Sequence, residues 1–435
     1  MNGTPRQYGT TASSGPTREL WIDIAKGVGI LAVIVGHSGV DAISHYLYWF
    51  HMPLFFAISG YLFNGWSTAS TTTPTSPLAV PSSFPHTPTI WGWLRHRAQR
   101  LLIPYAGFMA LLTLMRYALL PGMHWSSLPA ELPYLLAGGR FLTGMYGAVW
   151  FVTTLFVTQV LFGLLLRFCP RRWQQLTFIG VAYLLAHAEA LFWHGPRIPW
   201  NADVALLALT YYAVGFYARQ IRKALRPASA AGLMLADQAA SAPASSSAKP
   251  WPSPTVYRLG AVAWVIAVVW VLAERAGLLH YALDMKYLLY THTLLDLFIP
   301  LTWMVAVGTT CYVLASLAER ATSEAHSTAN HQGDVAGALT RAFRRYLSRF
   351  VIRPLTYLGR LSMPLMYLHF PVNSVLRART FYYGPLPFIV VGLFVPLALI
   401  WALERVTFTR TLLLGLPPTR RPQPAAGTAQ VVSCA

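Results

Sequence analysis

Three ionisable side chains lie in a stretch of sequence that is otherwise apolar enough for a membrane helix. Asp23, Lys26 and His37 occur in WIDIAKGVGILAVIVGHSG, which runs from residue 21 to 39. Asp23 and Lys26 are three residues apart, so they share one helical face and can pair. Histidine titrates near neutral pH, so it can take a proton from a hydroxyl group or carry a transferred group. These residue types are suited to general-base or nucleophilic catalysis.

The spacing of Lys26 and His37 places both residues on one stripe of a helix. Eleven residues at about 100° each complete three turns plus about 20°, with a rise of about 16 Å. Charges in membrane helices usually face a protein interior or a water-filled cavity. A polar cavity along the helix would therefore explain the stripe. The alternative is that Asp23 and Lys26 pair or snorkel at the cytoplasmic interface, while His37 only packs between helices.

Polar residues in other apolar segments could line the same cavity. Several ionisable groups on separate helices suggest a polar central cavity, and His369 lies at a depth comparable to that of His37. The alternative for the segment FHMPLFFAISGYLF is that it serves mainly for helix packing. A small Ser-Gly pair also lets another helix approach closely. The candidates are His51 and Ser59 in FHMPLFFAISGYLF, Asp296 four residues after His292, and His369 in LGRLSMPLMYLHFPV.

Two arginines in RHRAQRLLIPY could bind an anion where a basic helix enters the membrane. Arg97 and Arg100 are three residues apart and share one helical face. Guanidinium forks match phosphate oxygens, which suggests a phosphate site. The alternative is that the pair only sets the membrane topology and contacts anionic lipid.

The composition is that of a polytopic membrane protein. Of 435 residues, 55% are hydrophobic and 11% are charged, whereas soluble chains carry about 25% charged residues. The net charge of +19 comes from short basic clusters between apolar segments, so we expect no nucleic-acid partner. Cys169, Cys311 and Cys434 are widely scattered, so neither a disulfide framework nor a metal site is expected.

We predict an all-α fold of about ten transmembrane helices, each needing roughly 20 apolar residues. With both termini cytoplasmic, about 26 of the 33 Lys and Arg residues face inward, as expected for a bacterial cytoplasmic (inner) membrane protein. The predicted spans are residues 20–40, 46–63, 101–120, 147–166, 175–193, 203–221, 258–276, 287–316, 354–374 and 385–404.

The domain organisation follows from the low-complexity segments between these spans. Residues 1–18 lack an apolar signal-peptide core and are expected to form a flexible cytoplasmic N-terminus. Residues 19–405 would form the membrane domain, and 406–435 a cytoplasmic tail. Polar, Ser- and Pro-rich composition predicts flexible cytoplasmic loops. They cover residues 64–94, 222–257 and 317–350.

Taken together, these motifs resemble those of the membrane-bound acyltransferase family 3, and most closely its fucose 4-O-acetylase-like branch. Lys26-x10-His37 looks like that family's Arg/Lys-x10-His motif, and the next apolar segment resembles the one that follows it. The resemblance covers roughly residues 18–405. Its further segments are the Arg97-x-x-Arg100 pair, AVWFVTTLF with Trp150, IPWNADVALLALTYYAVGFYAR and LGRLSMPLMYLH.

The resemblance implies an O-acyltransferase that moves acetyl from acetyl-CoA, without a metal, to a sugar hydroxyl of a surface or exported glycan. His37 would be the catalytic histidine, as base or acyl carrier, with Lys26 as its motif partner and Asp23 holding Lys26. Lys26 stands where arginine is commoner and lacks the bidentate fork. Arg97 and Arg100 would bind acyl-CoA. The acceptor, a glycan or lipid-linked sugar, would meet His51, Ser59, Trp150, Asp296 and His369.

Two other classes of protein remain open. A secondary transporter could use His37, His369 and Asp296 as a proton relay. The sequence shows no paired inverted repeats of the kind many transporters have. A non-catalytic membrane subunit of a polysaccharide assembly machine is the other alternative.

Overall fold

The described part of the chain is helical in the computed structural model, apart from short turns and one isolated antiparallel bridge between Asp284 and Leu289. This confirms the predicted all-α class. The structure describes residues 19–64, 89–193, 195–225, 253–290, 292–327, 335–379 and 383–414. The predicted N-terminus at 1–18, most of the tail and most of the predicted loops 64–94 and 222–257 lie outside these ranges.

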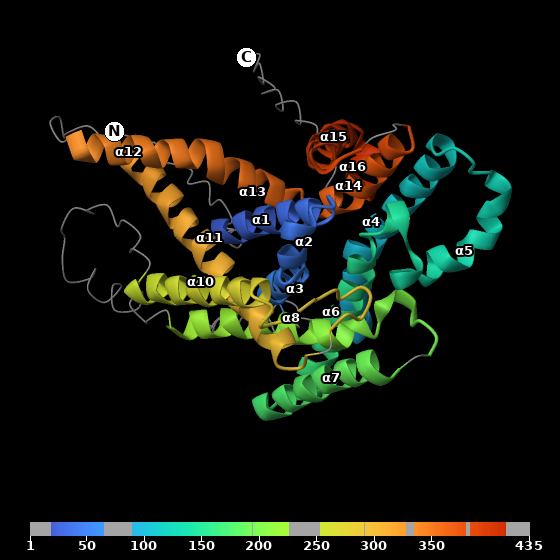
Figure 1. Cartoon of the computed structure of the whole chain (residues 1–435), viewed down its shortest axis with the longest axis horizontal. Coiled ribbons are helices and arrows are strands. Elements are labelled where there is room, and N and C mark those ends of the chain that lie inside the picture. Colours follow the sequence, from blue (N-terminus) through green and yellow to red (C-terminus); the bar gives the residue numbers. More distant parts are fainter. Residues whose placement is uncertain are drawn as a thin grey trace, which may run out of the picture.

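A central helix, α1 (Leu20–Gly36), packs against helices from both halves of the chain (Figure 1). It contacts α13 (Arg353–Arg360) most extensively, then α11 (Leu295–Ser327) and the following helix α2 (Asp41–Tyr48), and also α3 (His51–Tyr61) and α14 (Ser362–Arg377). The remaining helices are α4 (Ile90–Leu119), α5 (Leu128–Ala137), α6 (Trp150–Phe168), α7 (Arg172–Phe192), α8 (Val204–Leu225), α10 (Pro254–Arg275), α12 (Val335–Leu347), α15 (Pro385–Arg405) and α16 (Thr407–Leu412).

Six of the described helices are long and apolar enough to cross a membrane. They include α4, α6 with the turn before it, α7, α10, most of α11 and α15. The helices α1, α3 and α14 have 17, 11 and 16 residues, which is short for a span. They are largely buried, and the number ten and the cytoplasmic termini stay predictions.

Three predicted spans have wrong boundaries because the backbone breaks within them. The span 46–63 is divided between α2 and α3 at Phe50, whose φ of −140° is not helical. In the span 287–316 the helix begins only at Leu295, after a turn in which Leu288 has a φ of +59°. The span 354–374 breaks at Leu361, where ψ is 10°.

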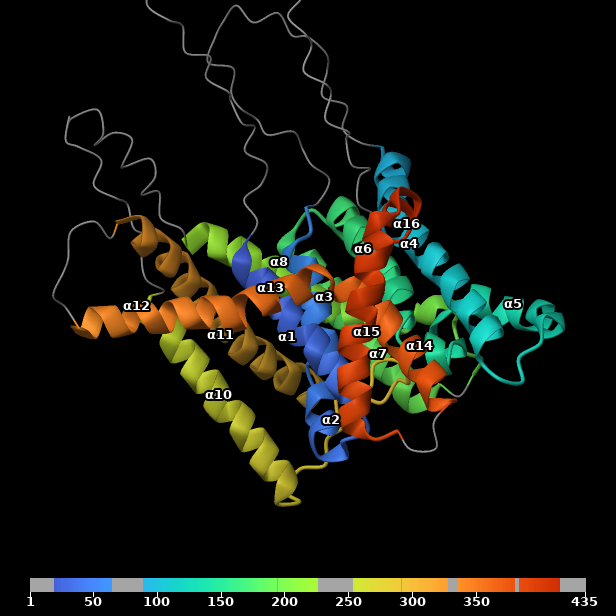
Figure 2. The same cartoon turned by 90° about the horizontal axis from the view of Figure 1, so that it is seen from above.

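The third break separates helices that run in different directions. Figure 2 shows α12 and α13 crossing the direction of α1 and α15, whereas α14 follows as a separate helix. Between α11 and α13, the predicted loop 317–350 contains the end of α11 and the whole of α12. The helix α12 places several basic side chains close to the membrane domain rather than in an unstructured linker.

Two glycines allow unusually close crossings of the central helices. A Cβ atom on Gly60 would lie 1.9 Å from the Tyr212 carbonyl oxygen, so α3 lies directly against α8. A Cβ atom on Gly359 would lie 1.8 Å from the Asp23 carbonyl oxygen, so α13 lies directly against α1. The close approach predicted for the Ser59-Gly60 pair is therefore confirmed.

Replacing Gly359 by alanine should destabilise the protein by about 1–3 kcal/mol, because the added methyl group must push α13 away from α1. Thermal unfolding of the purified protein in detergent measures the effect. The matched control is Gly308→Ala in α11, where a Cβ atom meets nothing within 4 Å. Equal melting temperatures for the two variants would contradict the predicted crossing.

Candidate active site

Three histidines from three helices meet at one end of α1. His37 follows the last turn of α1, His51 begins α3 and His369 lies within α14. The ring centroid of His37 is 6.4 Å from that of His51 and 5.6 Å from that of His369, with which it stacks. Phe370 closes one side at 4.6 Å. The structure thus brings together three residues that the sequence placed on separate spans.

Hydrogen bonds fix two of these rings in a known tautomer. His51 Nδ1 is 2.6 Å from the Leu47 carbonyl oxygen, and His369 Nδ1 is 3.2 Å from that of Leu365. A carbonyl oxygen can only accept, so both Nδ1 atoms carry a hydrogen and donate it. In the neutral rings Nε2 is therefore an acceptor. His369 Nε2 is buried and has no hydrogen-bond partner within the described structure.

His37 is held by Tyr48, a residue that the sequence did not single out. The Tyr48 hydroxyl lies 2.6 Å from His37 Nδ1. When Nδ1 donates to the phenol oxygen, Nε2 keeps its lone pair and can accept a proton. The turn at residues 37–40 brings α2 back towards α1, and no sequence motif marked Tyr48.

Replacing Tyr48 by phenylalanine should lower kcat about tenfold, because losing one hydrogen bond of about 1–1.5 kcal/mol frees the His37 ring to rotate. The control is Tyr46→Phe, which removes a bond to Glu274 and leaves His37 untouched. Equal activity of the two variants would show that Tyr48 does not orient His37.

A polar pocket opens beside His37. Its volume is about 530 Å³, within the range of small-molecule sites. The helix α2 is tied to α10 because Glu274 accepts a 2.6 Å hydrogen bond from Tyr46 and lies 3.2 Å from His45. The pocket is lined by Gly36, His37, Gly39, Asp41, Ser44, His45 and Tyr48.

A buried lysine on the segment before α11 adds positive charge to this site. Lys286 is 6% exposed, and its Nζ donates to the carbonyl oxygens of Leu142 at 2.7 Å and Gly147 at 3.1 Å. Burial lowers the pKa of Lys286 to about 8, and Asp284 opposes this effect. Lys286 also acts electrostatically on His37. No sequence motif marked this lysine.

The other residues of the stripe lie towards the opposite end of α1. Asp23 is buried and forms an ion pair with Arg360 of α13 at 3.9 Å. Lys26 and His37 are both partly exposed. Arg360 was not predicted as a partner of Asp23.

Asp296 belongs to a different cluster from the three histidines. His187 Nε2 lies 3.1 Å from Asp296 Oδ2, and both side chains are buried. The backbone N–H of His292 donates to the same oxygen at 2.9 Å. Asp296 therefore joins α7 to α11. We expected Asp296 and His37 to line one cavity, but the contacts of Asp296 are with His187 and His292 instead.

Ser59 and Trp150 are also not among the residues in contact with His37. Ser59 is partly buried on α3, eight residues and about 12 Å along the helix from His51. Trp150 begins α6, and its carbonyl oxygen accepts bonds from Thr153 and Thr154. Its buried ring lies against Phe151.

Arg97 lies at the other end of α3 from the histidines. It donates to the carbonyl oxygen of Asn64 at 3.2 Å and to Gln159 Oε1 at 3.4 Å. Its guanidinium group lies 5.0 Å from the centroid of the Phe63 ring. Arg100 is exposed on the same helix. Among the described residues, no group of His, Cys, Asp and Glu has the arrangement of a metal site.

The apolar helices indicate a multi-pass membrane protein. The three histidines beside the polar pocket provide side chains suited to general-base or nucleophilic catalysis. The family described as "Acyltransferase domain" matches residues 19–405, and the chain belongs to this family. This confirms the family suggested by the Lys26-x10-His37 and related motifs.

Two curated relatives share part of the sequence. The chain is 31% identical over 170 residues to nodulation protein NolL of Sinorhizobium fredii, covering 36% of this chain and 40% of the relative. It is 31% identical over 172 residues to nodulation protein NolL of Mesorhizobium japonicum, covering 37% and 39%. The match thus spans about two fifths of each relative. No solved structure matches the chain significantly.

Proposed function

We propose that this protein is a membrane-bound O-acyltransferase of the bacterial cytoplasmic membrane. It transfers an acyl group, most simply acetyl from acetyl-CoA, to a sugar hydroxyl of a surface or exported glycan. The observation that carries the proposal is the meeting of His37, His51 and His369 beside a polar pocket in a member of an acyltransferase family. The family match over residues 19–405 supports the class of reaction and names no particular glycan.

In the proposed reaction, His37 Nε2 accepts the proton of the acceptor hydroxyl as its oxygen attacks the thioester carbonyl carbon. The carbon–sulfur bond then breaks, and the CoA thiolate takes the proton from the imidazolium. In a second route, His37 Nε2 attacks the thioester carbonyl carbon, the carbon–sulfur bond breaks and CoA leaves as the thiolate. The acceptor hydroxyl then attacks the acetyl-imidazole, its proton passes to the thiolate, and the free imidazole is regenerated. Both routes need the ring orientation that Tyr48 provides.

The negative oxygen that develops on the thioester needs a nearby positive group. Lys286 supplies positive charge to the His37 site and is fixed by two carbonyl oxygens. Fixed charges of this kind stabilise a transition state more than a mobile side chain does. In this mechanism Lys286 therefore stabilises the oxyanion only through its charge, since it does not line the pocket and its Nζ donates to the two carbonyl oxygens.

The donor would enter from the opposite end of the molecule. Arg97, Arg100 and Lys26 are the candidates for guiding acyl-CoA, and the rise of about 16 Å from Lys26 to His37 is comparable to a pantetheine arm. This geometry supports delivery of acetyl to an acceptor on the far side of the membrane. Vesicles that contain the protein and hold acetyl-CoA on one side of the membrane only test this delivery. Product found only on the CoA side would contradict it.

The direct test of the function is mass spectrometry of surface glycans from a deletion strain and a His37→Ala strain. Both should lose one acyl mass increment that the wild type carries, and complementation should restore it. Loss in the deletion strain alone would favour a non-catalytic subunit. Transport of the acceptor across the membrane, with no change in the acceptor's mass, would favour a transporter.

A further inference from the structure

A second pocket lies at the end of α3 that is remote from the histidines. It has a volume of about 270 Å³ and lies between the chain after α3, the end of α6 and the last turns of α8. An apolar floor is combined with a polar rim. Its lining includes Phe63, Leu166 and Phe216 on the floor and Asn64, Arg219 and Lys223 on the rim.

The rim carries positive charge that the described structure does not neutralise. Arg219 Nη1 donates to Asn64 Oδ1 at 2.7 Å and to the Phe63 carbonyl oxygen at 3.2 Å, and both acceptors are neutral. Within the described ranges, neither Arg219 nor Lys223 forms an ion pair with a carboxylate. A concave site with two such cations favours an anionic ligand.

The pocket is joined to Arg97 through the same short segment. Arg97 donates to the Asn64 carbonyl oxygen, while Arg219 donates to the Asn64 side chain. The Arg97 guanidinium group also packs over the Phe63 ring, which forms part of the floor. Arginines from α4 and α8 thus hold one segment between them, and Lys223 extends the positive surface by one turn of α8.

We propose that this pocket binds the adenine-nucleotide end of the acyl-CoA donor, an inference that rests on the proposed function. The base lies on the apolar surface of Leu166 and Phe216, and the phosphate groups lie against Arg219 and Lys223. Guanidinium and ammonium groups are the side chains that bind phosphate oxygens most strongly. The arginine pair on α4 thereby becomes one wall of a larger site.

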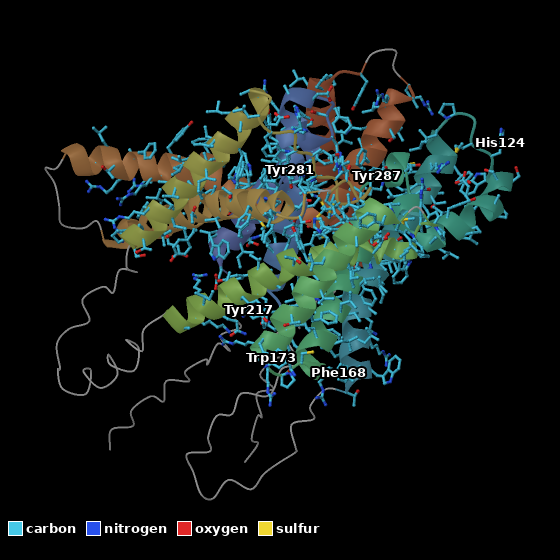
Figure 3. All side chains as sticks on the ribbon, turned by 60° about the horizontal axis from the view of Figure 1, so that its bottom comes forward. His124, Phe168, Trp173, Tyr217, Tyr281 and Tyr287 are labelled. Atoms are coloured by element: carbon cyan, nitrogen blue, oxygen red, sulfur yellow. The ribbon has the colours of Figure 1, made fainter. Side chains whose placement is uncertain are left out.

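The distance along α3 agrees with this placement. The helix α3 rises about 15 Å from His51 to Tyr61, and Phe63 follows two residues later, so the separation is comparable to a pantetheine arm. Figure 3 shows the two ends: Tyr217, close in sequence to Arg219, lies at one end with Trp173, whereas Tyr281 and Tyr287, on the segment of Lys286, lie at the other. A donor whose nucleotide end lies beside Phe63 and Lys223 can therefore extend its thioester to the His51 end of α3, where His37 lies.

The test is the affinity of the purified full-length protein for CoA, measured by isothermal titration calorimetry. Lys223→Gln should weaken CoA binding about tenfold, because one phosphate contact is lost. Arg258→Gln is the matched control, since it removes one exposed positive charge near the start of α10, away from the pocket. S-acetylpantetheine, which has no nucleotide, should be used equally well by the wild type and Lys223→Gln.

The outcomes separate this inference from the proposed function. If the wild type binds CoA and depends on His37, but Lys223→Gln and Arg258→Gln bind CoA equally, only the nucleotide pocket is wrong. If Lys223→Gln impairs acetylpantetheine as much as acetyl-CoA, the residue supports the fold and the assignment is again wrong. If the wild type binds no CoA, both the donor and its pocket are wrong.

Discussion

Replacing His37 by alanine should lower the rate of acyl transfer about 10³-fold, the loss expected when a positioned general base is removed. His37 is the proposed proton acceptor, and its ring contacts the Tyr48 hydroxyl and stacks on His369. The measurement is release of free CoA from acetyl-CoA by the purified protein with acceptor present. CoA affinity should be unchanged, because the donor's nucleotide end would lie at the opposite end of α3.

A second histidine in the same pocket provides the control. His45 lines the pocket with His37, but its Nε2 lies 3.2 Å from Glu274 at the α10 side. We expect His45→Ala to lower the rate by less than about tenfold, as for the loss of one peripheral polar contact. Equal losses for both variants, or an active His37→Ala protein, would contradict the assignment of His37.

The same preparation distinguishes the two chemical routes open to His37. Labelled acetyl-CoA without acceptor should leave label on the protein if His37 carries the acetyl group, and His37→Ala should abolish that label. If His37 acts only as a base, the wild type stays unlabelled while the complete reaction proceeds.

The three histidines could be predicted from the sequence because ionisable side chains within apolar segments are energetically costly and are visible in the local sequence. Histidines at similar depth in apolar segments need a common polar environment, and His37, His51 and His369 do meet. The same reasoning failed for Asp296, since a buried carboxylate takes whichever partner is nearest. That partner is His187 on α7, which spacing along the chain does not reveal.

Tyr48 and Lys286 could not be predicted because their positions depend on irregular backbone. Tyr48 reaches His37 because α2 follows the turn at residues 37–40 and is separated from α3 at Phe50, within the predicted second span. Lys286 reaches the site only because the segment before α11 folds inward instead of continuing the helix. Hydrophobicity averaged over a span-length window treats both breaks as continuous helix, so the predicted spans were too long at these two places.

The inward fold of the Lys286 segment is stabilised by a buried ion pair between two neighbouring loops. Arg140 Nη2 donates to Asp203 Oδ2, and the side chains are 11% and 0% exposed. Beside the pair, Asn201 accepts from the Arg140 backbone N–H at 2.6 Å and donates to the Lys286 carbonyl oxygen at 3.3 Å. The pair therefore links the loops before α6 and α8 to the lysine of the site.

Replacing Asp203 by alanine should destabilise the protein by about 3–5 kcal/mol, because the Arg140 charge stays buried without its partner. Thermal or denaturant unfolding in detergent measures this loss. The double variant Arg140→Leu/Asp203→Leu should recover much of it, since no unpaired charge is then left behind. Activity in the double variant should remain low, because the backbone that positions Lys286 has lost the charge pair beside it.

The matched control is the more exposed pair of Arg116 and Glu131. Their charged atoms are 3.1 Å apart, but both side chains are 26% exposed. Solvent screens such a pair, so Glu131→Ala should cost only about 0–1 kcal/mol. If Asp203→Ala costs no more than Glu131→Ala, the Arg140–Asp203 pair does not hold the loops together. Another interaction would then have to fix Lys286 beside His37.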